Sequence, residues 1–175
     1  HEGPSAHNTG SVAVAGAAGR VGVAVVDLLQ ERKVPGGEWA LLASARSEGR
    51  RMQCNGKSVQ IQRLDTFEFS NTQIGLFSAG GSVSAEFAPK AAAQGCIVVD
   101  NTSHFRNDDD IPLVVSEVNP ECVADYAPRN IIANPNCSTI QMMVALKPSH
   151  DAVGISRINV ATYQAGSGAG SSGIE

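Results

Sequence analysis

The sequence predicts an α/β fold built on a doubly wound, mostly parallel sheet. Short apolar segments alternate along the chain with stretches in which apolar residues recur at helical spacing, an order typical of parallel sheets. Glycine is abundant, with 18 residues among 175, and aromatic residues make up only 5%. This composition suits tight turns between strands and helices. A chain of this length can hold one filled domain, or one domain and part of another.

The composition also excludes several classes of partner. The net charge of −4 gives no basic surface for nucleic acid, and no apolar run approaches the roughly 18 residues that cross a bilayer. Residues 1–10 predict a flexible polar tail. The cysteines form no CxxC pair, so we expect reduced thiols and no metal site; they are Cys54, Cys96, Cys122 and Cys137. Asp108–Asp110 predicts a solvated turn.

The first apolar segment leads into a glycine-rich turn. Residues 11–15 predict a buried strand, Gly16, Gly19 and Gly22 follow, and a helix continues to about Pro35. Glycines let backbone amides approach a pyrophosphate, and a helix N-terminus favours its negative charge. The unit therefore predicts the start of a Rossmann-like dinucleotide site. Because the spacing is GxxGxxG rather than GxGxxG, a tight turn without a ligand stays the alternative.

The second strand, residues 39–43, ends in a loop that indicates which dinucleotide is bound. A site that prefers NAD usually carries a carboxylate here for the ribose 2′-hydroxyl. This chain instead has Arg46 between Ser44 and Ser47, and a guanidinium suits a 2′-phosphate. The loop predicts NADP; an exposed arginine without a ligand is the alternative.

The middle of the chain predicts a small β excursion and two further strands. Asn55-Gly56 within residues 50–65 is a hairpin signal. Residues 74–77 predict a strand that opens into a glycine-serine turn, with a helix over 85–93 after it. A strand over 96–99 then ends in a polar loop, where Arg106 can bind a phosphate or carboxylate.

The last strand, residues 131–133, precedes a sharp turn at Pro135, and residues 140–146 then predict the start of a helix. Cys137 falls at or next to the N-cap of this helix, with Ser138 and Thr139 as hydroxyl neighbours. The partial positive charge of a helix N-terminus favours the thiolate. A buried, inert cysteine is the alternative reading.

Several long stretches together resemble one known family, the aspartate-semialdehyde dehydrogenases, over about residues 11–175. The matching stretches are LLASARS, LFSAGGSVSAEFAPKAA, VVDNTSHFR, IIANPNCSTIQMMVALKP and TYQAGSGAG. The resemblance implies NADPH-dependent reductive dephosphorylation of L-4-aspartyl phosphate to L-aspartate 4-semialdehyde, a step toward lysine, threonine, methionine and isoleucine. It also implies a cytoplasmic protein, or a plastid one if the source is a photosynthetic eukaryote.

The resemblance assigns expected roles residue by residue. Cys137 matches the nucleophile that forms a thioester, Arg106 matches the phosphate-binding arginine, and Asn136 assists it. Gln164 matches the residue that positions the substrate. The positions that match NADP contacts are Gly16, Ala18, Gly19, Arg20, Val21, Arg46, Ser47, Ser167 and Gly168. The family usually has threonine where this chain has Ala18, so we expect somewhat weaker NADP binding.

The resemblance further implies two domains. Residues 11–136 would form the NADP-binding domain, and residues 137–175 would begin a catalytic and dimerisation domain. The expected partners are aspartyl phosphate, inorganic phosphate and, at full length, further copies in a homodimer or larger homo-oligomer. The family's general acid/base histidine lies beyond Glu175, so we expect the 175 residues alone to be inactive. The alternatives are a nucleotide-binding module without turnover and a reductase for N-acetylglutamyl phosphate.

Overall fold

A computed structural model of the chain describes residues 10–35 and 37–166. Its centre is a six-stranded sheet in the order β5-β2-β1-β6-β7-β8. All neighbouring strands run parallel. The strands are β1 (Val12–Ala15), β2 (Trp39–Ala43), β5 (Gln62–Arg63), β6 (Ile74–Phe77), β7 (Ile97–Asp100) and β8 (Ile131–Ala133). This order reverses between β1 and β6, as in a dinucleotide-binding fold, and it confirms the predicted doubly wound sheet.

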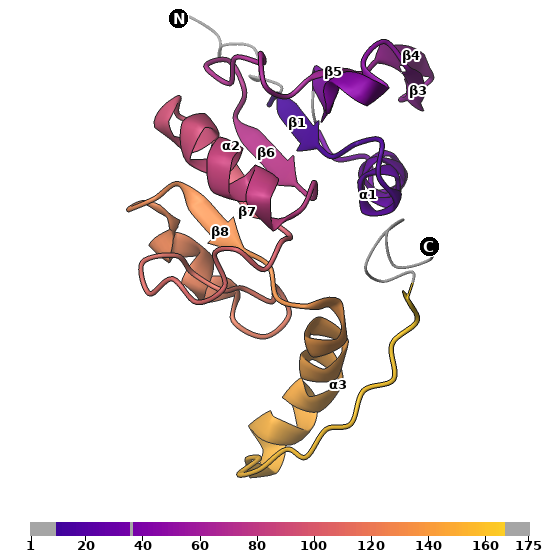
Figure 1. Cartoon of the computed structure of the whole chain (residues 1–175). Helices are drawn as coiled ribbons and strands as arrows, with labels where there is room; N and C mark the ends of the chain where they lie inside the picture. Colours follow the sequence, from indigo (N-terminus) through magenta and orange to yellow (C-terminus); the bar gives the residue numbers. More distant parts are fainter. Residues whose placement is uncertain (1–9, 36, 167–175) are drawn as a thin grey trace, which may run out of the picture.

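Helices α1 (Arg20–Glu31) and α2 (Gly81–Ala93) lie on opposite sides of the sheet (Figure 1). Successive strand residues face opposite sides, so each strand serves two cores. Val14 packs with Val26 of α1 in one cluster, whereas Ala13 packs with Ala88 of α2 in the other. Both faces of the central strands are therefore apolar, as a sheet covered on two sides requires.

The predicted β excursion is a hairpin of β3 (Arg51–Cys54) and β4 (Lys57–Gln60). Asn55 and Gly56 both have positive φ, 51° and 73°, which is the backbone of a two-residue turn that matches strand twist. The loop after β2 contains a single 3₁₀ turn, η1 (Ala45–Ser47), and a longer one, η2 (Pro120–Tyr126), precedes β8.

One predicted helix is longer in the structure than the sequence indicated, since α2 begins at Gly81 rather than at residue 85. Helix α3 spans Cys137–Val153 and includes residues 140–146, which were predicted as a helix start. Pro148 lies inside α3. Proline removes one helical hydrogen bond, but the helix continues to Gly154, whose φ of 72° ends it.

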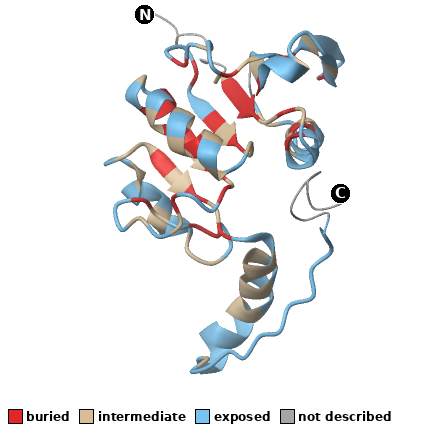
Figure 2. Ribbon diagram, in the orientation of Figure 1, coloured by how far each residue is buried: buried red, intermediate tan, exposed pale blue. Residues whose placement is uncertain are grey.

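Helix α3 differs from the rest of the fold in its burial. Figure 2 shows buried residues concentrated in the strands and α2, whereas α3 projects from the sheet with none. The described residues after it, up to 166, run back along the helix as an extended segment (Figure 1). Within the described residues, no helix is long and apolar enough to span a membrane.

Candidate active site

The glycine-rich turn after β1 brings three backbone segments together. Gly16 has a φ of 91°, and a Cβ there would lie 2.9 Å from the carbonyl carbon of Ser78. A Cβ at Gly22 would overlap the carbonyl oxygen of Gly16, so α1 can start this close to the turn only with glycine. Gly19 is the N-cap of α1 and offers no side-chain cap. The first amides of α1 are therefore free to bind an anion.

A hollow of about 770 Å³ lies in front of this turn. It adjoins the ends of β1, β2 and β6, which is where open parallel sheets bind ligands. The predicted cofactor residues that line it are Gly16, Ala18, Gly19, Arg20, Val21, Arg46 and Ser47. The structure thus brings together every predicted cofactor residue that it describes. Ser167 and Gly168 lie outside the described residues.

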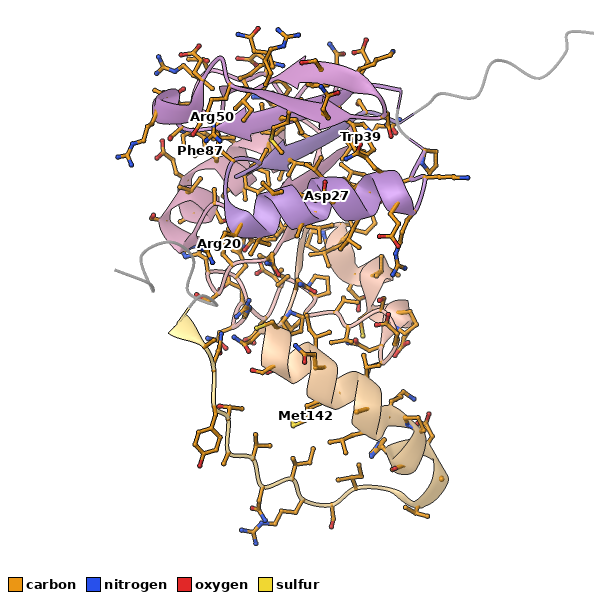
Figure 3. The ribbon with its side chains drawn as sticks, turned by 90° about the vertical axis from the view of Figure 1, so that its right-hand side faces the viewer. Arg20, Asp27, Trp39, Arg50, Phe87 and Met142 are labelled. Carbon is orange, nitrogen blue, oxygen red and sulfur yellow. The ribbon has the colours of Figure 1, made fainter. Side chains whose placement is uncertain are left out.

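The remaining wall of the hollow comes from residues that the sequence analysis did not assign to the site. They are Ala43, Ser44, Ala45, Leu64, Asp65, Ser78, Ala79, Val83, Glu86 and Phe87. Val83, Glu86 and Phe87 recur at three- and four-residue spacing on α2, and this spacing could have indicated a shared helix face. Figure 3 shows Phe87 and Arg20 at the same end of the molecule, where α1 begins.

The charges around the hollow are not balanced. Its two carboxylates each form an ion pair with a cationic side chain. Arg63 Nη2 lies 2.5 Å from Asp65 Oδ2, and Lys90 Nζ lies 2.9 Å from Glu86 Oε1. The hydrogen bond from Arg63 also lowers the pKa of the Asp65 carboxyl. No ion pair involves Arg20 or Arg46 among the described residues. The hollow therefore presents two guanidinium groups to an anionic ligand.

Arg106 lies at the carboxyl edge of the sheet, in the loop after β7. Its Nε donates to the carbonyl oxygen of Asn134 at 2.9 Å, and its Nη2 donates to the carbonyl oxygen of Asn101 at 3.2 Å. The Asn134 side chain also donates to the Asn101 side chain at 2.7 Å. A guanidinium has five N–H groups, so Arg106 is held in place and still has donors for an anion.

Cys137 is the first residue of α3 and is exposed. Asn136 is the N-cap, and its Oδ1 accepts hydrogen bonds from the Ser138 amide at 3.0 Å and the Ser138 hydroxyl at 2.5 Å. The Cys137 sulfur lies 3.9 Å from the same oxygen. The predicted helix start is thus confirmed, although the hydroxyl of Ser138 bonds to Asn136 and not to the thiol.

The structure does not bring every predicted substrate residue together. Gln164 is exposed in the extended segment after α3, and no hydrogen bond joins it to Arg106 or Cys137 in the described part of the chain. That segment carries no buried residue that would fix it, so its role stays a prediction. Across residues 10–35 and 37–166, no cluster of side chains could hold a metal ion.

Three kinds of comparison relate this chain to known proteins. The family model described as "Semialdehyde dehydrogenase, NAD binding domain" matches residues 11–126. Among curated proteins, aspartate-semialdehyde dehydrogenase 2 of Vibrio cholerae is 61% identical over 165 residues, covering 94% of this chain and 49% of the relative. The enzyme of Aquifex aeolicus is 53% identical, with 94% of this chain and 48% of the relative covered.

Solved structures agree with the curated relatives. The Vibrio cholerae aspartate-semialdehyde dehydrogenase II, complexed with ASA, superposes with a TM-score of 0.93 at 59% identity over 96% of this chain and 50% of that one. The Candida albicans enzyme with NADP superposes with a TM-score of 0.67 at 25% identity, over 85% and 48%. The chain spans about half the length of the curated relatives that it matches. It belongs to the semialdehyde dehydrogenase family, whose NAD-binding domain it contains.

Proposed function

We propose that this chain serves the NADPH-dependent reductive dephosphorylation of L-4-aspartyl phosphate to L-aspartate 4-semialdehyde. One observation in the structure supports this reaction independently of family membership. The guanidinium of Arg106 is fixed on the carbonyl of Asn134, three residues before Cys137. An anion-binding group and an exposed thiol at a helix N-terminus thus share one edge of the sheet, as the cleavage of an acyl phosphate by a thiolate requires.

In this proposal Cys137 carries the covalent step. Its thiolate attacks the acyl carbon, the C–S bond forms, and the C–O bond to phosphate breaks as inorganic phosphate leaves with the electron pair. Arg106 binds the departing phosphate through the N–H groups that Asn134 and Asn101 leave free. Asn136 assists Arg106 at the phosphate in this proposal, while its Oδ1 accepts a hydrogen bond from the Cys137 sulfur 3.9 Å away. A reduced nicotinamide bound in the hollow would supply the hydride to the thioester carbon. The C–S bond then breaks, which releases the aldehyde and returns the electron pair to the Cys137 thiolate.

The charge of the hollow supports NADP as the cofactor. The carboxylates of Asp65 and Glu86 are already paired, so they leave Arg20 and Arg46 to interact with phosphates. Arg46 follows β2, at the position where a 2′-phosphate binds in related folds. No carboxylate of the loop over residues 44–47 is available for a free ribose 2′-hydroxyl. These features favour NADP over NAD.

Titration of both nucleotides into the chain tests this preference. Arg46→Ala should weaken NADP binding about tenfold to a hundredfold, because it removes a charge-assisted contact worth roughly 1.5–3 kcal/mol, and should leave NAD binding nearly unchanged. Arg50→Ala is the matched control, since Arg50 is exposed nearby and does not line the hollow. Equal affinities of the parent chain for NADP and NAD would contradict the proposed preference for NADP.

The thioester has its own test. The chain incubated with aspartyl phosphate and no nucleotide should gain the mass of an aspartyl group on the peptide that contains Cys137. Cys137→Ser should form no thioester that hydroxylamine releases. Absence of the adduct on the parent chain would favour a nucleotide-binding module without turnover. An adduct with N-acetylglutamyl phosphate in preference to aspartyl phosphate would favour the related reductase.

A further inference from the structure

Asp100, the last residue of β7, is a buried carboxylate that the proposed reaction does not use. Its side chain is fully buried. Oδ1 accepts from the Ser84 hydroxyl at 2.5 Å, and Oδ2 accepts from the Thr102 hydroxyl at 2.7 Å. No ion pair neutralises it among the described residues. Both carboxyl oxygens are thus satisfied by hydroxyl groups, as a buried polar group requires.

The two hydroxyl donors come from different parts of the site. Ser84 lies in the first turns of α2, the helix whose next turn lines the cofactor hollow. Thr102 begins the loop that leads to Arg106, and its Oγ1 also accepts from the His104 amide at 3.3 Å. The carboxylate of Asp100 therefore fastens this loop to the start of α2.

The same residue lies next to both anchors of Arg106. The carbonyl oxygen of Asp100 accepts from the Asn134 amide at 2.8 Å, and Asn134 in turn accepts from Arg106 Nε. Asn101, the neighbour of Asp100, accepts from Arg106 Nη2. Both hydrogen bonds that orient the guanidinium thus end on residues next to Asp100: Asn134 is hydrogen-bonded to its carbonyl oxygen, and Asn101 follows it in the chain.

We propose that Asp100 is a positioning residue for Arg106, acting through Thr102 to hold the loop over residues 101–106 in the conformation that aims the guanidinium at a phosphate. The consequence for phosphate binding rests on the proposed function of Arg106. The positioning itself does not, because it can be observed in the chain without any ligand.

The test measures how fast the Nε–H of Arg106 exchanges with solvent, by NMR of the full 175-residue chain. Thr102→Val keeps the shape of the side chain but removes the donor to Asp100, and should speed this exchange roughly fivefold, the size of one ordinary hydrogen bond. Thr102→Ser keeps the hydroxyl and should restore the parent rate. Ser84→Ala removes the other donor to the same carboxylate and should have a smaller effect, since it leaves the loop attached.

A second arginine separates positioning from a general loss of structure. Arg51 Nε donates to the Ser58 hydroxyl at 2.8 Å in the distant hairpin, and its exchange should be the same in all variants. The proposal is wrong if Thr102→Val leaves the exchange rate of the Arg106 Nε–H unchanged, or if the exchange of Arg51 accelerates equally.

Titration with inorganic phosphate adds the functional readout. Thr102→Val should weaken phosphate binding by the same factor as it speeds the exchange of Arg106. An unchanged phosphate affinity would mean that Asp100 does not influence phosphate binding. If Arg106→Ala leaves phosphate affinity unaltered, the proposed role of Arg106 fails, while the exchange rates still decide the positioning.

Discussion

The sheet and helix α3 are built in opposite ways. Every buried hydrophobic side chain of the described residues lies between Val12 and Ala133, and all but Val12, Val114 and Val115 belong to two clusters on either face of the sheet. Helix α3 is the longest helix of the described chain and has no buried residue. Its apolar positions, such as Met142 in Figure 3, lie well away from the sheet. The fully buried core of the described residues therefore lies in and around the sheet, and none of it lies in α3.

The junction between the two regions is where the predicted chemistry lies. Asn134 belongs to the sheet through its bonds to Asp100 and Asn101, and Cys137 begins the helix that leaves it. A helix N-terminus needs only its first turn to be ordered for its partial charge to act on a neighbour. The rest of α3 can thus stay uncovered without altering the surroundings of the thiol.

The largest expected difference between the two regions is in stability. Phe77→Ala should lower the free energy of unfolding by about 3–5 kcal/mol, because Phe77 is 1% exposed and packs on Phe69 with ring centroids 6.0 Å apart. Val144→Ala on α3 should change it by no more than about 0.5 kcal/mol, since Val144 is 39% exposed. Urea denaturation measures both. Similar losses for the two variants would mean that α3 is packed in solution.

An intermediate effect should separate two glycines of the turn after β1. Gly22→Ala would force a Cβ into the carbonyl oxygen of Gly16 and should cost roughly 1–3 kcal/mol of stability, together with nucleotide affinity. Gly19→Ala is the control for stability, because its Cβ would come no closer than 3.3 Å to that oxygen. Denaturation of the pair gives the answer, and nucleotide titration of Gly22→Ala against the parent chain gives the loss of affinity. If Gly19→Ala is the more damaging variant, the close approach of α1 is not what the turn requires.

The smallest expected effect on stability comes from alkylation of the cysteines, although the cysteines should differ strongly in their rate of alkylation. Iodoacetamide near pH 7 should label the exposed Cys137 before the buried Cys96, since burial raises the pKa of the Cys96 thiol from 9.0 to about 12. That change leaves about a thousandfold less thiolate at Cys96. Alkylation of Cys137 should leave the unfolding free energy almost unchanged. Peptide mapping after brief labelling tests the order, and faster labelling of Cys96 would contradict the burial of the sheet.

Local sequence signals predicted most of the sheet. The turn at Asn55-Gly56 and the strand–glycine–helix unit depend on residues adjacent in the chain, so their patterns are visible without the fold. The start of α2 was missed because Gly81 and Ser82 have poor helix propensity. The burial of Ser84 on Asp100 stabilises that turn, and this contact joins residues far apart in the sequence.

The candidate site was predictable to a similar degree. Gly16, Arg20 and Arg46 follow strand ends, and parallel strands bring such ends to one edge, so their meeting in one hollow could be expected. The roles of Asn101 and Asn134 as acceptors for Arg106 could not, because backbone carbonyls leave no mark in the sequence. The end of α3 could not be predicted from the local pattern either, because Pro148 is tolerated inside the helix.

The contact of Gly16 with Ser78 and Ala79 also sets the order in which this fold can be assembled during synthesis. Strand β1 and its turn leave the ribosome before β6, yet β1 pairs on one side with β6, and the turn packs against the residues that follow β6. The nucleotide-binding turn therefore has its full support only after residue 79 has emerged. Until then, β1 is an apolar strand with one edge unpaired, the kind of segment that chaperones protect from aggregation.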